Sequence, residues 1–220
     1  MIQHFGEKVC ASNFTSRRRN PIAIAIVRCT LPDRTSLHQA GEHAAHRAMA
    51  TVTNETARET RIEKDRLGKP HGYTLSGRHV PVSISHSFPF AFAAASIDNV
   101  ALGADVERIR DFAEHTWEAF LTPQEKEFIA MAPKQERERL RTLAWSLKES
   151  TLKALGVGIR KHPARIDTAR ALAADESSQD SIMINGVVSH SFVQLWKIED
   201  TFIATTVALT AGNAYNAYYP

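Results

Sequence analysis

The sequence predicts an α+β protein made of two similar α/β subdomains in a pseudo-two-fold arrangement, with a ligand cleft between them. Two observations lead to this prediction. The order of strand, helix and strands occurs twice along the 220 residues. The strands expected at Ile22–Arg28 and Val100–Glu107 also occupy like positions in the two halves. We expect the boundary near Asn99–Gly103, which gives an N-terminal subdomain of residues 1–99 and a C-terminal one of residues 100–220.

The first half begins with a short apolar run, Ile22–Arg28, which predicts a buried strand. The segment from Ser36 to about Val52 is rich in Ala, His and Arg, and we expect a helix there. Glycine and proline alternate in Gly68–Gly72, which predicts a loop. The other expected elements of this half are a mixture of helix and exposed loop at Glu55–Leu67, strands at Val80–Ser85 and Phe90–Ile97, and a tight turn at Asp98-Asn99.

The second half starts with the strand Val100–Glu107 and continues with two helices. Thr122 is suited to cap the first helix, because Pro123 fits the first helical position and Glu125 completes a capping box. The second helix is expected from near Pro133 to about Leu155, where Gly156 ends it. The rest reads as β structure, with strands at Ile182–Ile184, Gly186–Ile198 and Thr201–Leu209 and a polar loop at Asp175–Asp180.

Composition and charge exclude several classes of function. The net charge of +3 and the pI of about 9.0 favour an acidic partner or a phosphate-rich ligand. They are too small to indicate nucleic-acid binding, and Arg17–Arg19 is a short basic run that we expect in a solvated loop. Two cysteines are too few for a disulfide framework. No signal peptide is visible, and no apolar stretch approaches the ~20 residues of a membrane span. We therefore expect a cytoplasmic protein that binds no membrane.

The strand Val100–Glu107 ends in two carboxylates. Side chains alternate along a strand, so Asp105 and Glu107 share one face. Two carboxylates at the end of a buried strand repel each other unless a cation lies between them, and oxygen ligands of this kind suit Mg²⁺. Asp-x-Glu is a common pattern, however, and by itself it favours a strand that simply ends in solvent.

A second pattern, Trp145–Lys153, falls on the second expected helix. Glu149 and Lys153 are four residues apart and share a helical face. Glu149 is a candidate third metal ligand or base, Lys153 is suited to neutralise a diphosphate, and Lys148 is free to point elsewhere. The alternative is an exposed ion pair that contributes little.

A third pattern, Ser83–Ser87, surrounds His86 with serines that can hydrogen-bond phosphate oxygens. It follows Gly68-Lys69-Pro70, which offers a lysine and open backbone. A lone histidine is more often a surface or capping residue, so this pattern also decides nothing by itself.

The order and spacing of these patterns, over about Arg66–Gly158, resemble the 4′-phosphopantetheinyl transferase superfamily. Given the chain length and the doubled architecture, the sequence looks like the larger, pseudo-dimeric members. The resemblance implies a Mg²⁺-dependent enzyme that transfers 4′-phosphopantetheine from coenzyme A to a serine of an apo acyl or peptidyl carrier protein and releases 3′,5′-ADP. It also implies an acidic carrier as partner, and we expect a monomer because one chain supplies both walls of the cleft.

The resemblance implies a role for each matching residue. Asp105, Glu107 and Glu149 are the implied ligands of Mg²⁺, and Glu149 is also the implied base. Lys153 is expected to contact the diphosphate of coenzyme A. The remaining coenzyme A contacts are expected from Ser85 and His86 at the 3′-phosphate, Lys69 near the adenine or ribose, and Arg47. Arg47 is the best match to a basic helix of the family, where this sequence offers mainly histidines.

Two rival functions remain open from the sequence. A metal-dependent phosphohydrolase using Asp105 and Glu107 would need further ligands, of which the nearby sequence supplies only Glu149. A non-catalytic coenzyme A-binding module is less consistent with a complete set of acidic residues and Lys153. Release of phosphate from simple esters would favour the first rival.

Overall fold

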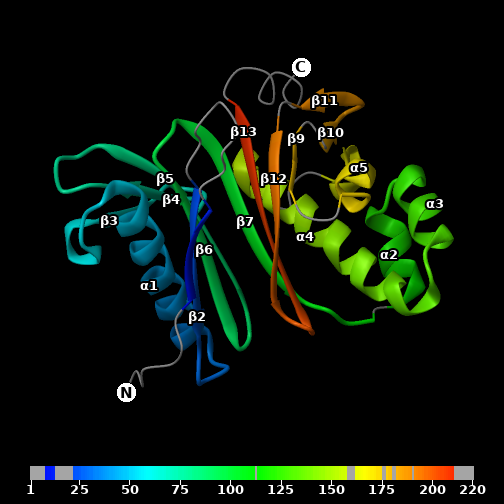
Figure 1. Cartoon of the computed structure of the whole chain (residues 1–220), viewed down its shortest axis with the longest axis horizontal. Coiled ribbons are helices and arrows are strands. Elements are labelled where there is room, and N and C mark those ends of the chain that lie inside the picture. The colour runs from blue at the N-terminus through cyan, green and yellow to red at the C-terminus, as the bar shows by residue number, and fades with distance from the viewer. Residues whose placement is uncertain are drawn as a thin grey trace.

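The protein, described here from a computed structural model, is arranged in four layers (Figure 1). Helix α1 (Arg34–Thr53) covers one sheet, that sheet stacks on a second sheet, and helix α4 (Arg137–Leu155) covers the second. The structure describes residues 8–12, 22–111, 113–157, 162–174, 177–179, 182–189 and 191–210.

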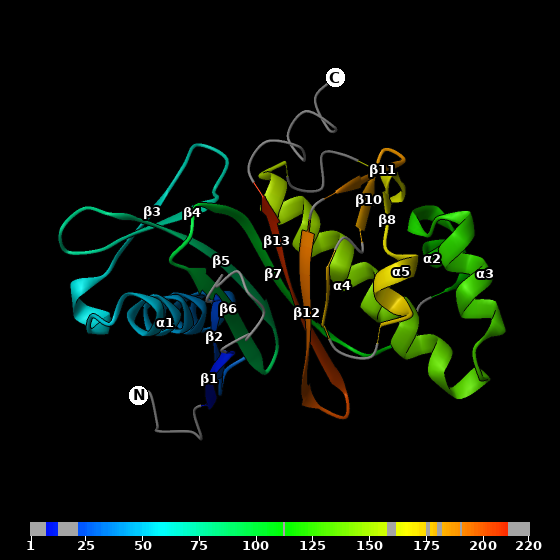
Figure 2. The ribbon, with the colours of Figure 1, turned by 45° about the horizontal axis from the view of Figure 1, so that its top comes forward.

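The first sheet is wholly antiparallel and has the strand order β1-β2-β6-β5-β4-β3. Its strands are β1 (Lys8–Ser12), β2 (Ile22–Arg28), β3 (Arg61–Lys64), β4 (Pro70–Tyr73), β5 (His79–Ser87) and β6 (Phe90–Ser96). Figure 2 shows β3 and β4 extending this sheet above α1. A short 3₁₀ helix, Ala57–Glu59, links α1 to β3.

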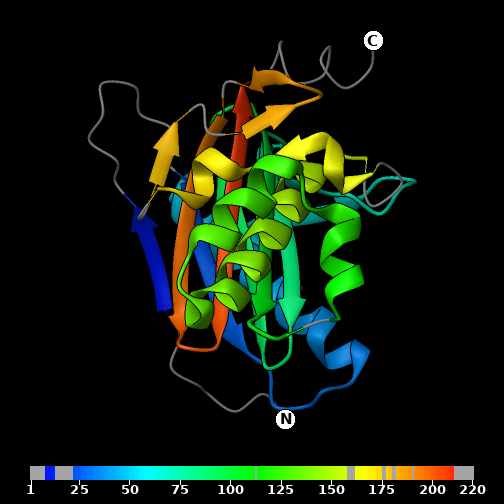
Figure 3. The same cartoon turned by 90° about the vertical axis from the view of Figure 1, so that its right-hand side faces the viewer.

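The second sheet has the order β7-β13-β12-β9 and is also antiparallel. Its strands are β7 (Val100–Arg108), β9 (Ser177–Gln179), β12 (Ser191–Glu199) and β13 (Phe202–Thr210). Figure 3 shows α4 lying across these strands, with α2 (Glu114–Phe120), α3 (Pro123–Met131) and α5 (Ala169–Leu172) around it. The remaining elements are 3₁₀ turns at Lys134–Glu136 and Pro163–Arg165 and a small sheet of β8 (Ile166–Asp167), β10 (Ile182–Ile184) and β11 (Val187–Ser189).

The continuous apolar run of β6 follows from its position between two layers. Phe90, Phe92 and Ala94 pack against the second sheet, whereas Ala93 and Ala95 pack under α1. Because successive side chains of a strand point to opposite faces, a strand covered on both sides has no position for polar residues. The core is therefore divided into a layer between the two sheets and a layer under each helix.

The two sheets are joined by side chains rather than by a backbone ladder. Strand β5 pairs with β4 only over His79–Pro81. Further along β5, the Ser83 hydroxyl accepts a hydrogen bond from the backbone N–H of Ala104 in β7, at 2.9 Å. The boundary between the two halves of the chain thus lies where β5 and β7 run beside each other. The division into subdomains at residues 99 and 100 stays a prediction.

Both helix boundaries that the sequence indicated by capping residues are confirmed. The Thr122 hydroxyl accepts the Glu125 N–H and the Glu125 carboxylate accepts the Thr122 N–H, which is the predicted capping box. Helix α4 ends at Gly156, which adopts the left-handed conformation with φ 72°.

Other sequence predictions were wrong in part. Pro70–Gly72, expected as a loop, lies in β4, because β3 and β5 pair with it from both sides. Residues 61–64, expected as helix or loop, form β3, and β9 lies within the expected polar loop because it pairs with β12. Helix α2 was not anticipated. The basic run 17–19 lies outside the described residues. Within the part of the chain that the structure describes, no helix is both long and apolar enough to cross a membrane.

Candidate active site

Strand β7 and helix α4 present three carboxylates to one another. The even-numbered residues of β7 from Leu102 to Val106 pack between the sheets, so Gly103, Asp105 and Glu107 face α4. A Cβ added at Gly103 would lie 1.8 Å from the carbonyl oxygen of Ser150. The absence of a side chain at this position therefore lets α4 lie directly on the strand.

Asp105 is the most enclosed of the three, with 3% of its surface exposed. Its Oδ1 accepts hydrogen bonds from the Lys153 ammonium at 2.7 Å and from the Ser85 hydroxyl at 2.8 Å. Its Oδ2 is buried and has no hydrogen-bond partner in the protein. A carboxylate oxygen without a donor is costly in a buried site, so it indicates a missing positive partner.

Glu107 and Glu149 lie on either side of the same electrostatic problem. Burial, followed by the charge of Asp105, raises the pKa of Glu107 from 4.5 to about 7, although its Oε1 accepts a hydrogen bond from Trp145 Nε1 at 3.1 Å. Burial also raises the pKa of Glu149; the Lys153 ammonium opposes that shift and the Asp105 charge adds to it. Its Oε1 is buried without a partner. Clustered carboxylates with raised pKa values are typical of functional sites.

The donor chemistry of these residues fits a hard divalent cation. The two orphaned oxygens, Asp105 Oδ2 and Glu149 Oε1, are of the type that Mg²⁺ prefers. A cation beside them would lower the raised pKa values by favouring the ionised carboxylates. Among the described residues, no three or more His, Cys, Asp or Glu side chains are gathered in a group that holds a metal by itself. Asp105, Glu107 and Glu149 as a ligand set therefore stays a prediction.

A pocket of about 240 Å³ opens beside these carboxylates, between the β3–β4 loop, β5 and the C-terminal end of α4. Its walls are largely apolar and include Leu67, Val82 and Ile84. Two lysines far apart in the sequence, Lys69 and Lys153, line it together. Apolar walls with a few convergent cations are suited to an organic ligand that carries phosphate.

Lys69 is held against the end of α4. Its ammonium donates to the Ala154 carbonyl at 3.0 Å, where the helix dipole is negative. Burial lowers the pKa of Lys69, and the nearby Asp65 carboxylate opposes this shift. The cation is thus positioned by the helix end and remains on the wall of the pocket.

A sequence model of the 4′-phosphopantetheinyl transferase superfamily matches residues 101–207, which include β7, α4 and β13. The chain belongs to the 4′-phosphopantetheinyl transferase superfamily. This confirms the resemblance found in the sequence. The chain is also similar to the 4′-phosphopantetheinyl transferase HetI of Nostoc sp. (strain PCC 7120), with 26% identity over 148 residues. The alignment covers 61% of this chain and 62% of that relative, so the chain spans about three fifths of the relative's length.

The other site residues expected for a phosphopantetheinyl transferase lie in different surroundings. His86 is exposed on β5, and Arg47 lies on α1; neither lines the pocket. Ser85 is buried, with 8% of its surface exposed, and its hydroxyl is directed to Asp105. Of the predicted coenzyme A contacts, the structure brings only Lys69 and Lys153 to the pocket wall.

Sequence reasoning missed Asp65, which shapes the pocket from the β3–β4 loop. Its Oδ1 accepts the backbone N–H groups of Leu67 at 2.8 Å and of Lys69 at 2.9 Å. These bonds, with that from the Lys69 N–H listed first by strength, lower the pKa of Asp65. An Asp followed by Gly within a few residues is a turn pattern in which the carboxylate bonds the backbone two residues on. That pattern was present in the sequence.

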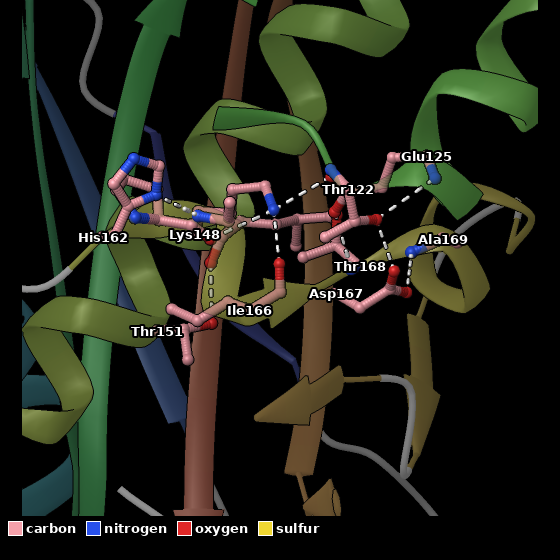
Figure 4. A network of polar contacts seen from close by, with 12 residues as sticks. Thr122, Glu125, Lys148, Thr151, His162, Ile166, Asp167, Thr168 and Ala169 are labelled. Carbon is pink, nitrogen blue, oxygen red and sulfur yellow. Dashed lines mark hydrogen bonds and ion pairs between the residues drawn. The ribbon is translucent and has the colours of Figure 1, made fainter. Parts of the chain in front are cut away.

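Lys148, next to Glu149, lies away from the pocket in a buried polar network (Figure 4). Its ammonium pairs with Glu125 Oε2 at 2.9 Å, and both side chains are fully buried. Lys148 also donates to the carbonyl of Ile166, and Glu125 Oε1 accepts the hydroxyl of Thr168 at 2.7 Å. The network fastens α4 to α3 and to the segment before α5, so Lys148 anchors the helix that carries Glu149.

Proposed function

We propose that this member of the superfamily transfers 4′-phosphopantetheine from coenzyme A to a serine hydroxyl of an apo acyl or peptidyl carrier protein. The products are the holo carrier protein and 3′,5′-ADP. The name of the Nostoc relative supports this class of activity, and the arrangement of β7, α4 and the pocket supports the choice of substrate.

One contact carries the proposal. Lys153 lines the pocket and at the same time donates to Asp105 Oδ1 at 2.7 Å. A phosphate that accepts a hydrogen bond from Lys153 would therefore lie beside the carboxylate cluster. Such a site brings an anionic ligand and a base within reach of each other, which is the main requirement of phosphoryl transfer.

The proposed reaction exchanges one phosphorus–oxygen bond for another. The carrier serine Oγ bonds to the β-phosphorus of coenzyme A, and the bond from that phosphorus to the oxygen of the departing 3′,5′-ADP breaks. The serine proton goes to the Glu149 carboxylate, directly or through a water. Burial raises the pKa of Glu149, so it is a stronger base than an exposed carboxylate. Lys153 is placed to stabilise the charge on the leaving diphosphate.

Asp105, Glu107 and Glu149 are the residues that we propose to hold Mg²⁺. When bound, Mg²⁺ supplies charge neutralisation and Lewis-acid polarisation of phosphate oxygens. Lys69 is proposed to bind the nucleotide part of coenzyme A on the far wall of the pocket. His86 and Arg47 remain predicted contacts of the 3′-phosphate.

The carrier partner is proposed to be acidic, because the chain has a net charge of +3 and opposite charge favours encounter. We also propose the pseudo-dimeric type within the superfamily. The packing of one helix on each of two stacked sheets supports two similar halves with the pocket at their junction. A monomer is expected on this basis, and a sizing column that returned a stable trimer would contradict it.

The first experiment is an intact-mass assay with the protein, coenzyme A, Mg²⁺ and an apo carrier protein. We expect the carrier to gain the mass of one phosphopantetheine, and the gain to disappear with EDTA. Asp105→Ala and Glu149→Ala should abolish it, whereas Glu127→Ala, a matched change of an exposed carboxylate on α3, should leave it intact.

Two outcomes would contradict the proposal. No mass gain on several unrelated carriers, together with measurable coenzyme A binding, would leave a binding module. Metal-dependent release of phosphate from simple esters, without coenzyme A binding, would favour a phosphohydrolase.

A further inference from the structure

Ser85 stands apart from the other predicted phosphate contacts because its partner is a carboxylate. We infer that Ser85 is a positioning residue that orients Asp105 for a divalent cation, and not a ligand of a coenzyme A phosphate. The inference rests on the proposed function, since it concerns the metal that the proposed site would hold.

The hydrogen bonds of Asp105 are divided unequally between its two oxygens. Oδ1 takes both donors, the Ser85 hydroxyl at 2.8 Å and the Lys153 ammonium at 2.7 Å. The donors come from different sheets and helices, β5 and α4, and hold the carboxylate from two sides. Oδ2 is left buried and without a donor. An oxygen fixed in this way is available to a metal, and such outer partners of a ligand tune metal affinity.

The geometry of Ser85 is poorly suited to binding phosphate. A serine hydroxyl has one proton to donate, and here Asp105 receives it. The side chain is buried and does not line the pocket that Lys69 and Lys153 share. Contact with a phosphate would require Ser85 to leave Asp105, which would remove one of the two donors from a buried charge.

Ser83 provides an internal comparison on the same strand and the same face. It is also buried, and its hydroxyl accepts the N–H of Ala104 at 2.9 Å. Ser83 therefore holds the backbone of β7, whereas Ser85 holds the side chain of the next residue, Asp105. Removing either hydroxyl deletes the same atoms from neighbouring positions, so Ser83→Ala is the matched control for Ser85→Ala.

The test measures metal affinity directly. Mn²⁺ is titrated into the full chain in the presence of coenzyme A and without carrier, and free Mn²⁺ is followed by electron paramagnetic resonance. Loss of a partner that orients a metal ligand typically weakens binding about 10-fold to 100-fold. We expect this loss for Ser85→Ala and less than about threefold change for Ser83→Ala. In steady-state assays, Ser85→Ala should raise the half-saturating Mg²⁺ concentration and leave the KM for coenzyme A within about twofold.

The opposite pattern would overturn the inference. If Ser85 bound the 3′-phosphate, Ser85→Ala would raise the KM for coenzyme A, leave Mn²⁺ affinity unchanged, and reduce the preference for coenzyme A over dephospho-coenzyme A. Absence of Mn²⁺ binding by the unaltered chain would also overturn it, and would separately remove the metal from the proposed function. Carrier modification without such binding would show that the transfer reaction survives while the metal assignment fails.

Discussion

Substitution of Gly103 by alanine tests whether the contact between β7 and α4 sets the site. The new Cβ would lie 1.8 Å from the Ser150 carbonyl oxygen and 2.6 Å from the Ala154 nitrogen. Both are backbone atoms, so relief to the 3.0 Å that real contacts require means moving α4 by about 1.2 Å. Overpacking typically costs about 1–3 kcal/mol, and a clash with backbone belongs at the upper end. At about 3 kcal/mol, a chain of this size should lose roughly 6–12 °C in Tm.

The same displacement should reduce activity, because Glu149 and Lys153 move with the helix. A misplacement of about 1 Å at a reacting centre can lower the rate about 100-fold. The measurement is Tm by scanning calorimetry, and kcat/KM well below the lower Tm.

Gly41→Ala is the control for this test. The new methyl would lie 2.8 Å from a side-chain atom of Ile84 that can move, and alanine adds helix propensity in α1. Gly41→Ala should keep Tm within a few degrees and retain activity. A Gly103→Ala variant with unaltered Tm and kcat/KM would refute the role of this contact.

Three further substitutions give separate readouts. The pKa of Glu107 rises from 4.5 to about 7 on folding, so its contribution to stability is present below pH 4.5 and is lost as pH rises through about 7. Glu107→Gln should therefore flatten the decline of Tm between pH 5 and pH 7.5 in metal-free buffer, and an unchanged slope would count against the raised pKa. Lys148→Met leaves Glu125 charged and buried, which should cost about 3–5 kcal/mol in urea unfolding. Adding Glu125→Gln should recover part of that loss, whereas additive losses would exclude the ion pair as the cause. Lys69→Ala should raise the KM for coenzyme A about tenfold or more with little change in kcat, and Lys64→Ala, an exposed lysine of β3, should not; equal effects would place Lys69 outside the binding site.

Local patterns in the sequence predicted the elements whose identity is decided locally. The capping box at Thr122 and the Gly156 end of α4 are interactions within a few residues of each other, and both are confirmed. Strands β4 and β9 were missed for the opposite reason. Proline, glycine and polar residues predict loops, but pairing with strands distant in sequence stabilises Pro70–Tyr73 and Ser177–Gln179 as strands. Sheet edges depend on tertiary contacts more than on propensity.

The candidate site shows the same division. Alternation along β7 and the four-residue spacing on α4 were enough to put Asp105 and Glu107 on one face and Glu149 with Lys153 on another. The spacing could not show that these two faces meet, which depends on Gly103. Nor could it show the direction of the Ser85 hydroxyl, because β5 reaches Asp105 only through the packing of the two halves. A residue type that suits phosphate suits a carboxylate equally well as a hydrogen-bond donor.

Helix α4 explains why its motif is so dense in polar residues. One side of the helix presents Glu149 and Lys153 to β7, and Ser146 and Ser150 meet Thr205 of β13 through buried hydroxyl hydrogen bonds of 2.9 Å and 2.6 Å. Another side presents Lys148 to Glu125, and Trp145 donates to Glu107.

A helix surrounded by protein would ordinarily be apolar on every side. Here each polar residue of the motif has a partner that fixes the helix in rotation and along its axis, which hydrophobic contacts alone do loosely. Loss of Ser146, Ser150 or Lys148 should therefore lower stability and activity together. Loss of Lys153 should lower activity more than stability, because only its partner, Asp105, belongs to the proposed chemistry.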